Sequence, residues 1–88
     1  MYSILLADDE PLQRLTVRRI LESEFAADVM EVSDGSAALQ RLKDPLNERI
    51  DLALIDIDMP VINGLELLRE IRKQWPRLPC IVLTGSER

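Results

Sequence analysis

Four short apolar runs, separated by segments with helical spacing, constrain the fold of this 88-residue chain more than any other feature. The runs begin at Ile4, Val29, Leu52 and Cys80, and each has the length of a strand. Between them, apolar residues recur every three or four positions, as they do along one face of a helix. These residues are Leu12, Leu15 and Ile20, then Ala38, Leu39 and Leu42, and finally Leu65, Leu68 and Ile71. The alternation predicts an α/β fold, with a parallel sheet, right-handed crossovers and helices on both faces.

Helix boundaries are marked by proline and by capping residues. Pro11 suits the first turn of the first helix, and Ser36 and Asn63 are candidate N-caps of the second and third. Pro45 and Pro76 lie where the second and third helices should end.

The composition of the strands predicts their places in the sheet. Glu31 lies within the second run, as expected for an edge strand with one wet face, whereas the other runs are apolar and should be covered on both faces. The fourth run ends at Leu83, and no further strand follows it before Arg88. We therefore expect residues 1–88 to be an incomplete domain, from strand one to strand four, without an output domain. An exposed strand four could also pair with a second copy of the chain to give a homodimer.

The charge balance narrows the possible partners. Sixteen acidic and eleven basic residues give a net charge of -5, which argues against nucleic acid or an anionic membrane as a partner and favours a cation. The chain has no histidine and one cysteine, so a zinc site and an internal disulfide are both disfavoured. No apolar run has the length of a bilayer span, and we expect a soluble, cytoplasmic protein.

Polar side chains follow the strands at the edge of the sheet where parallel α/β folds bind ligands. They are Asp8, Asp9 and Glu10 after the first run, Asp56 and Asp58 after the third, and Thr84 after the fourth. Several carboxylates close together require raised pKa values or a cation, and oxygen ligands around an open position suit Mg²⁺. The alternative for the first group is an acidic turn that caps the helix beginning at Pro11, and we expect one of its three acids to do so.

Asp56 is the sharpest candidate for chemistry, because it interrupts an apolar strand where an unpartnered carboxylate would be costly. A carboxylate beside Mg²⁺ can accept a phosphoryl group. Thr84 could donate its hydroxyl to a phosphoryl oxygen, although a β-branched residue at the end of a strand needs no such role.

These motifs, in this order, resemble the receiver domain of bacterial two-component response regulators over the entire chain. They are Asp8-Asp9, Asp34-Gly35, Asp56-Ile57-Asp58-Met59-Pro60, Asn63-Gly64 and Leu83-Thr84-Gly85. The resemblance implies a flavodoxin-like three-layer fold with sheet order 2-1-3-4, here without the fifth strand and the last two helices. It also implies phosphorelay signalling rather than an enzyme, apart from self-catalysed phosphorylation and dephosphorylation.

The resemblance also assigns roles to individual residues. Asp56 would take the phosphoryl group from the phosphohistidine of a sensor histidine kinase or phosphotransfer protein. Asp9 would bind Mg²⁺ directly, Asp8 directly or through water, and Asp58 through its backbone carbonyl. Thr84 would be the switch hydroxyl that closes onto the phosphoryl group.

The chain departs from the family at its C-terminal end. Receivers carry a lysine on the fifth strand that pairs with the phosphoryl oxygen, and the lysines here, Lys43 and Lys73, lie at helical positions away from the expected site. We therefore expect weak or absent phosphorylation of these 88 residues alone. Relatives dock their kinase around the first helix, but we interpret Arg14 and Arg18 on that helix as a solvated charged face.

Two other functions remain open from the sequence. Asp56-Ile57-Asp58 is also the Asp-x-Asp of haloacid dehalogenase-like, Mg²⁺-dependent phosphatases, but those enzymes place it on the first strand with Thr or Val where Pro60 stands here. The other alternative is a pseudo-receiver that binds partners without phosphorylation, which the retained acids and Thr84 argue against.

Overall fold

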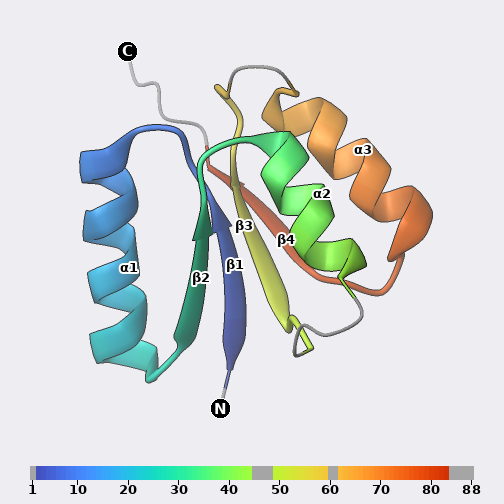
Figure 1. Ribbon diagram of the computed structural model, residues 1–88. Helices are drawn as coiled ribbons and strands as arrows, with labels where there is room; N and C mark the ends of the chain where they lie inside the picture. The colour runs from blue at the N-terminus through green and yellow to red at the C-terminus, as the bar shows by residue number, and fades with distance from the viewer. Residues whose placement is uncertain (1, 45–48, 60–61, 84–88) are drawn as a thin grey trace.

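The computed structural model describes residues 2–44, 49–59 and 62–83, so Pro45, Pro60 and the residues from Thr84 onward lie outside the described part. Its strands are β1 (Ser3–Ala7), β2 (Asp28–Val32), β3 (Leu52–Asp56) and β4 (Cys80–Leu83). They pair in parallel in the order β2-β1-β3-β4 (Figure 1). This confirms the predicted flavodoxin-like order.

Within the described residues, helices α1, α2 and α3 cover the two faces of this sheet (Figure 1). Helix α1 (Pro11–Phe25) lies on one face, and α2 (Gly35–Lys43) and α3 (Gly64–Gln74) lie together on the other. None of the helices in the described residues is long and apolar enough to span a membrane.

Strand β1 lies at the centre of the core because its side chains alternate between the two faces. Leu5 and Ala7 pack on the side of α2 and α3, while Ile4 and Leu6 pack on the side of α1. All four are buried, as expected for a strand with paired neighbours and covered faces.

The predicted apolar stripe of the first helix does not face the sheet. Leu12, Leu15 and Ile20 are 70%, 38% and 50% exposed, and Val17 and Leu21 pack against the sheet instead. Helix α1 thus has apolar residues on two sides, and helical spacing alone could not show which side packs against the sheet.

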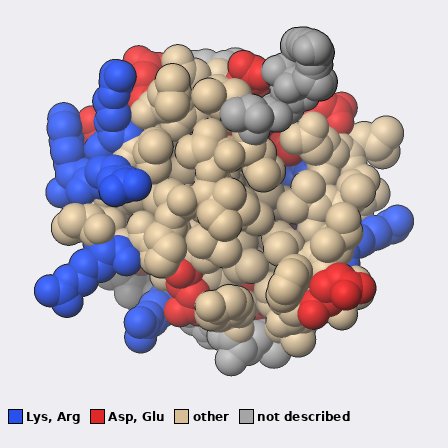
Figure 2. All heavy atoms as spheres, turned by 180° about the vertical axis from the view of Figure 1, so that it is seen from behind, with Lys and Arg blue, Asp and Glu red and all other residues tan. Residues whose placement is uncertain are grey.

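The molecule seen from behind, after a turn of 180° from the view of Figure 1, has a broad central area of uncharged side chains (Figure 2).

Capping residues set where each helix begins. Glu10 caps α1 by accepting from the Gln13 N–H, so one of the three N-terminal acids is a cap, as expected. Asn63 caps α3 as predicted. The prediction of Ser36 as a cap is wrong, because Asp34 accepts from the Ala37 N–H and α2 begins one residue before Ser36.

Candidate functional site

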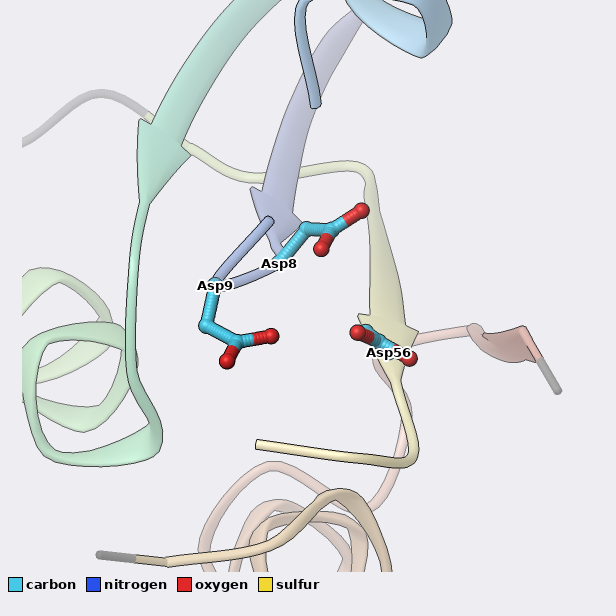
Figure 3. A group of neighbouring side chains, drawn as sticks. All are labelled: Asp8, Asp9 and Asp56. Carbon is cyan, nitrogen blue, oxygen red and sulfur yellow. The ribbon is translucent and has the colours of Figure 1, made fainter. Parts of the chain in front are cut away.

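The sheet register brings two acidic residues side by side. Ala7 pairs with Ile55, so the next residues, Asp8 and Asp56, reach the carboxyl ends of two adjacent strands together. Asp9 follows from the β1–α1 loop, and its side chain points toward the same space (Figure 3). One carboxylate oxygen from each of Asp8, Asp9 and Asp56 lies within 4.8 Å of the other two. The predicted convergence of these three residues is therefore observed, and the donor set fits a hard divalent cation such as Mg²⁺.

Asp8 is fully buried and is fixed by hydrogen bonds at every polar atom. Its N–H donates to the Val32 carbonyl at 3.1 Å, and its carbonyl accepts from Arg14 Nη1 at 2.7 Å. Its carboxylate Oδ1 accepts from the Glu10 N–H at 2.9 Å, and its Oδ2 accepts from Gln13 Nε2 at 2.9 Å. Asp8 is thus held in place by β2 and by the first turn of α1.

Asp56 is 5% exposed and occupies the last position of β3. Burial is the main cause that raises its pKa, and the negative charges of Asp8 and Asp9 raise it further. The Asp58 N–H, which donates to Asp56 Oδ1 at 3.2 Å, opposes this rise. A bound cation would favour the charged form of this carboxylate, so the site suits a metal electrostatically.

The other two predicted site residues are placed only in part. Asp58 is exposed beside the cluster and contacts Asp56 through its N–H; the metal role of its carbonyl stays a prediction. Thr84 lies outside the described residues. Its neighbour Leu83 pairs with Asp56 in the sheet, and the Leu83 carbonyl accepts from the Ile57 N–H at 3.1 Å, so β4 ends alongside the site.

Gly64 is a structural requirement of the site to which the sequence pattern assigned no role. The Gly64 N–H donates to the Ile57 carbonyl at 3.0 Å, which brings the start of α3 against the backbone directly after β3. A Cβ at this position would lie 2.5 Å from both the Asp56 carbonyl oxygen and the Ile57 Cα. Only glycine fits here without displacing Asp56. In the sequence, the position of Gly64 directly after the candidate cap Asn63 was the signal that could have pointed to this role.

The interpretation of Arg14 and Arg18 as a solvated face is wrong for Arg14. Both arginines form ion pairs with Glu31 of β2, and the Arg14 side chain is only 20% exposed. Burial alone would raise the pKa of Glu31, but the hydrogen bonds from the two arginines outweigh it and lower the pKa. The predicted wet face of the edge strand is therefore covered by α1, and Arg14 links Glu31 to the Asp8 carbonyl.

The comparisons with known proteins give the family. The model of the response regulator receiver domain matches residues 4–88. This chain belongs to the response regulator receiver domain family. The glycerol metabolism activator of Pseudomonas putida is 33% identical over 88 residues, which are 99% of this chain but 39% of the relative. The receiver domain described here thus spans about two fifths of that relative.

Solved structures with the same fold include TrrA from Thermotoga maritima. Its complex with Mg²⁺-BeF superposes with a TM-score of 0.88 at 34% identity, covering 99% of this receiver domain and 72% of that chain. Its complex with histidine kinase ThkA gives a TM-score of 0.86 at 34% identity, covering 100% of this receiver domain and 72% of that chain. This receiver domain therefore shares the fold of a protein that has been seen both with Mg²⁺-BeF and with a kinase.

The family resolves the choice between a receiver and a phosphatase of haloacid dehalogenase type. The Asp-x-Asp motif begins at the end of the third strand, and the receiver match extends on both sides of it. The receiver family places the chain in two-component phosphorelay signalling.

Proposed function

We propose that Asp56 is the phosphoacceptor of this receiver domain and that Asp8, Asp9, Asp56 and the Asp58 carbonyl hold Mg²⁺ for the transfer. The observation that carries the proposal is the convergence of three carboxylates within 4.8 Å at the ends of β1 and β3. The Mg²⁺-BeF complex of TrrA supports it, because that relative has the same fold.

The transfer uses the Asp56 carboxylate as nucleophile. One of its oxygens attacks phosphorus, the bond from phosphorus to the donor nitrogen breaks, and the electron pair of that bond stays on the nitrogen of the donor imidazole. Bound Mg²⁺ would neutralise charge on the phosphoryl oxygens. The Asp58 N–H restrains the Asp56 carboxylate through Oδ1, and Asp8 is held by the contacts described above.

Thr84 retains its proposed role as the hydroxyl that closes onto the phosphoryl group. Support comes from the described end of β4, since Leu83 pairs with Asp56. We propose no further enzymatic activity beyond phosphorylation and dephosphorylation of Asp56.

The test is intact-mass spectrometry after incubation with Mg²⁺ and a small phosphodonor. The complete domain should gain one phosphoryl group and its Asp56→Asn variant none, whereas residues 1–88 alone should show weak or absent phosphorylation. Absence of any gain in the complete domain at long incubation, with a folded spectrum, supports a pseudo-receiver. Equal gain in the complete domain and its Asp56→Asn variant places the phosphoryl group elsewhere.

The proposed partner is a sensor histidine kinase or a phosphotransfer protein. The complex of TrrA with a histidine kinase supports this choice. The net charge of -5 supports the absence of direct nucleic-acid or membrane binding, and a cytoplasmic location stays a prediction.

We also propose that residues 1–88 form part of a larger receiver fold. Exposed apolar side chains on two elements support this. Ile81 of β4 is 49% exposed, and Leu12 and Ile20 of α1 are 70% and 50% exposed. Such surface is normally covered in a complete domain. A homodimer through β4 is the other way to cover Ile81, and a sedimentation mass that rises with concentration would support it. A monodisperse monomer with cooperative unfolding would argue against an incomplete domain.

A further inference from the structure

The side chain of Gln13 holds the carboxylate of Asp8. Gln13 Nε2 donates to Asp8 Oδ2 at 2.9 Å from the first turn of α1. We infer that Gln13 is a positioning residue of the metal site, which keeps the Asp8 carboxylate turned toward Asp9 and Asp56. This inference rests on the proposed function of the acidic cluster as a Mg²⁺ site.

The contacts around Asp8 show why Gln13 has a separate role. The Asp8 main chain is fixed by Val32 and Arg14, and these bonds place its Cα but leave the side chain free to rotate. The Glu10 N–H fixes Oδ1, and the Gln13 amide fixes Oδ2. With both oxygens bonded, the plane of the carboxylate is set; without Gln13, one bond remains and the carboxylate can turn about it.

A neutral amide suits this position chemically. It donates a hydrogen bond to Asp8 without adding a positive charge, so the three carboxylates keep their full attraction for a cation. Each carboxylate oxygen can accept more than one bond, so Oδ2 can hold the amide and still face a metal or its water. Partners that orient metal ligands in this way typically change metal affinity 10- to 100-fold when they are removed.

The experiment is a titration with MgCl₂ alone, followed by ¹H–¹⁵N NMR at constant ionic strength. Gln13→Met keeps the length and helix preference of the side chain but removes the donor. The matched control is Gln74→Met, because Gln74 makes the same kind of bond, to Glu70 of α3, away from the site. We expect a dissociation constant about 10-fold higher for Gln13→Met and within about twofold of wild type for Gln74→Met.

A second pair of variants tests whether Gln13 acts through Asp8. In an Asp8→Asn background, adding Gln13→Met should change the Mg²⁺ dissociation constant less than twofold, because the charged group that Gln13 orients is gone. A role confined to the stability of α1 would lower the urea midpoint of Gln13→Met without this dependence on Asp8.

The outcomes separate this inference from the function on which it rests. If wild type shows no saturable Mg²⁺ binding, both the proposed Mg²⁺ site and the role of Gln13 are overturned. If wild type binds and folded Gln13→Met binds equally well, or its effect persists in Asp8→Asn, only the role of Gln13 is overturned. Should Gln13→Met not fold, Gln13→Leu also removes the donor at a helical position; equal Mg²⁺ affinity in that variant overturns the inference as well.

Discussion

Replacing Asp56 by Asn removes a negative charge from the crowded end of the sheet while preserving the shape of the side chain. The Asn oxygen can still accept from the Asp58 N–H, which donates to Asp56 Oδ1 at 3.2 Å in wild type. The replacement therefore isolates the electrostatic cost of the buried charge. We expect Asp56→Asn to be more stable than wild type at pH 7 when no divalent cation is present.

The size of the gain follows from the distance to Asp8. Carboxylate oxygens of the two residues lie within 4.8 Å of each other. Two unit charges at this separation repel by about 3 kcal/mol at an effective dielectric constant of about 20. Partial protonation of Asp56 and solvent screening reduce this repulsion, so the expected increase in unfolding free energy is about 1–3 kcal/mol.

The pH dependence has a definite sign. The pKa of Asp56 is raised in the folded state, chiefly by burial and then by Asp8 and Asp9, so the folded protein holds this proton more tightly than the unfolded chain does. Below the ordinary aspartate pKa the group is protonated in both states and costs nothing. Its cost appears as the pH rises through the folded pKa. The advantage of Asp56→Asn should therefore be largest at pH 7 and should shrink toward pH 4.

The measurement is urea unfolding of both proteins at pH 7 and at pH 4, in the presence of a chelator. Asp28→Asn, at an exposed position of β2, is the control and should change the unfolding free energy by less than about 0.5 kcal/mol. Adding Mg²⁺ at ten times its dissociation constant should stabilise wild type by about 1.4 kcal/mol and narrow the gap. An Asp56→Asn protein no more stable than wild type at pH 7, or an advantage that grows toward pH 4, would refute the reasoning.

Three further predictions concern packing, capping and thiol reactivity. Gly64→Ala should lower the unfolding free energy by about 1–3 kcal/mol, because its Cβ would lie 2.5 Å from the Asp56 carbonyl oxygen; an unchanged urea midpoint would contradict this. Asn63→Ala should cost about 1 kcal/mol by removing the N-cap of α3, whereas Ser36→Ala, which removes no cap, should cost less than about 0.5 kcal/mol in the same assay. Burial raises the pKa of the Cys80 thiol, so a disulfide reagent at pH 7 should modify it much more slowly in the folded protein than in urea, and equal rates would argue against its burial.

Much of the fold could be predicted because strand composition and sheet position are linked. The apolar runs specified parallel strands, and the acids that follow them had to meet at one edge once β1 and β3 were neighbours. Asp8, Asp9 and Asp56 were therefore found from position alone. Asn63 was found for a similar reason, since a cap acts within a few residues of its own helix. The prediction that β4 is covered on both faces is wrong for the described residues, because Ile81 is 49% exposed.

Apart from the cap of α2, which is Asp34 rather than Ser36, the errors concern contacts between elements that are distant in the chain. Leu12 and Ile20 have the spacing of a buried face, but α1 turns Val17 and Leu21 toward the sheet. Arg14 looked like a surface charge because its partner, Glu31, lies 17 residues away on β2. Neither orientation follows from spacing within one helix.

The sequence by itself determined the order of elements, the edge at which the acids gather and the residue that we propose as the phosphoacceptor, because strand ends and periodicity are local properties. Only the tertiary structure decided how firmly each acid is held. Asp8 is fixed by β2 and by Gln13. Gly64 lies against the Asp56 backbone, where any other side chain would clash. These contacts depend on distances between packed elements, which the pattern of residues along a single chain does not contain.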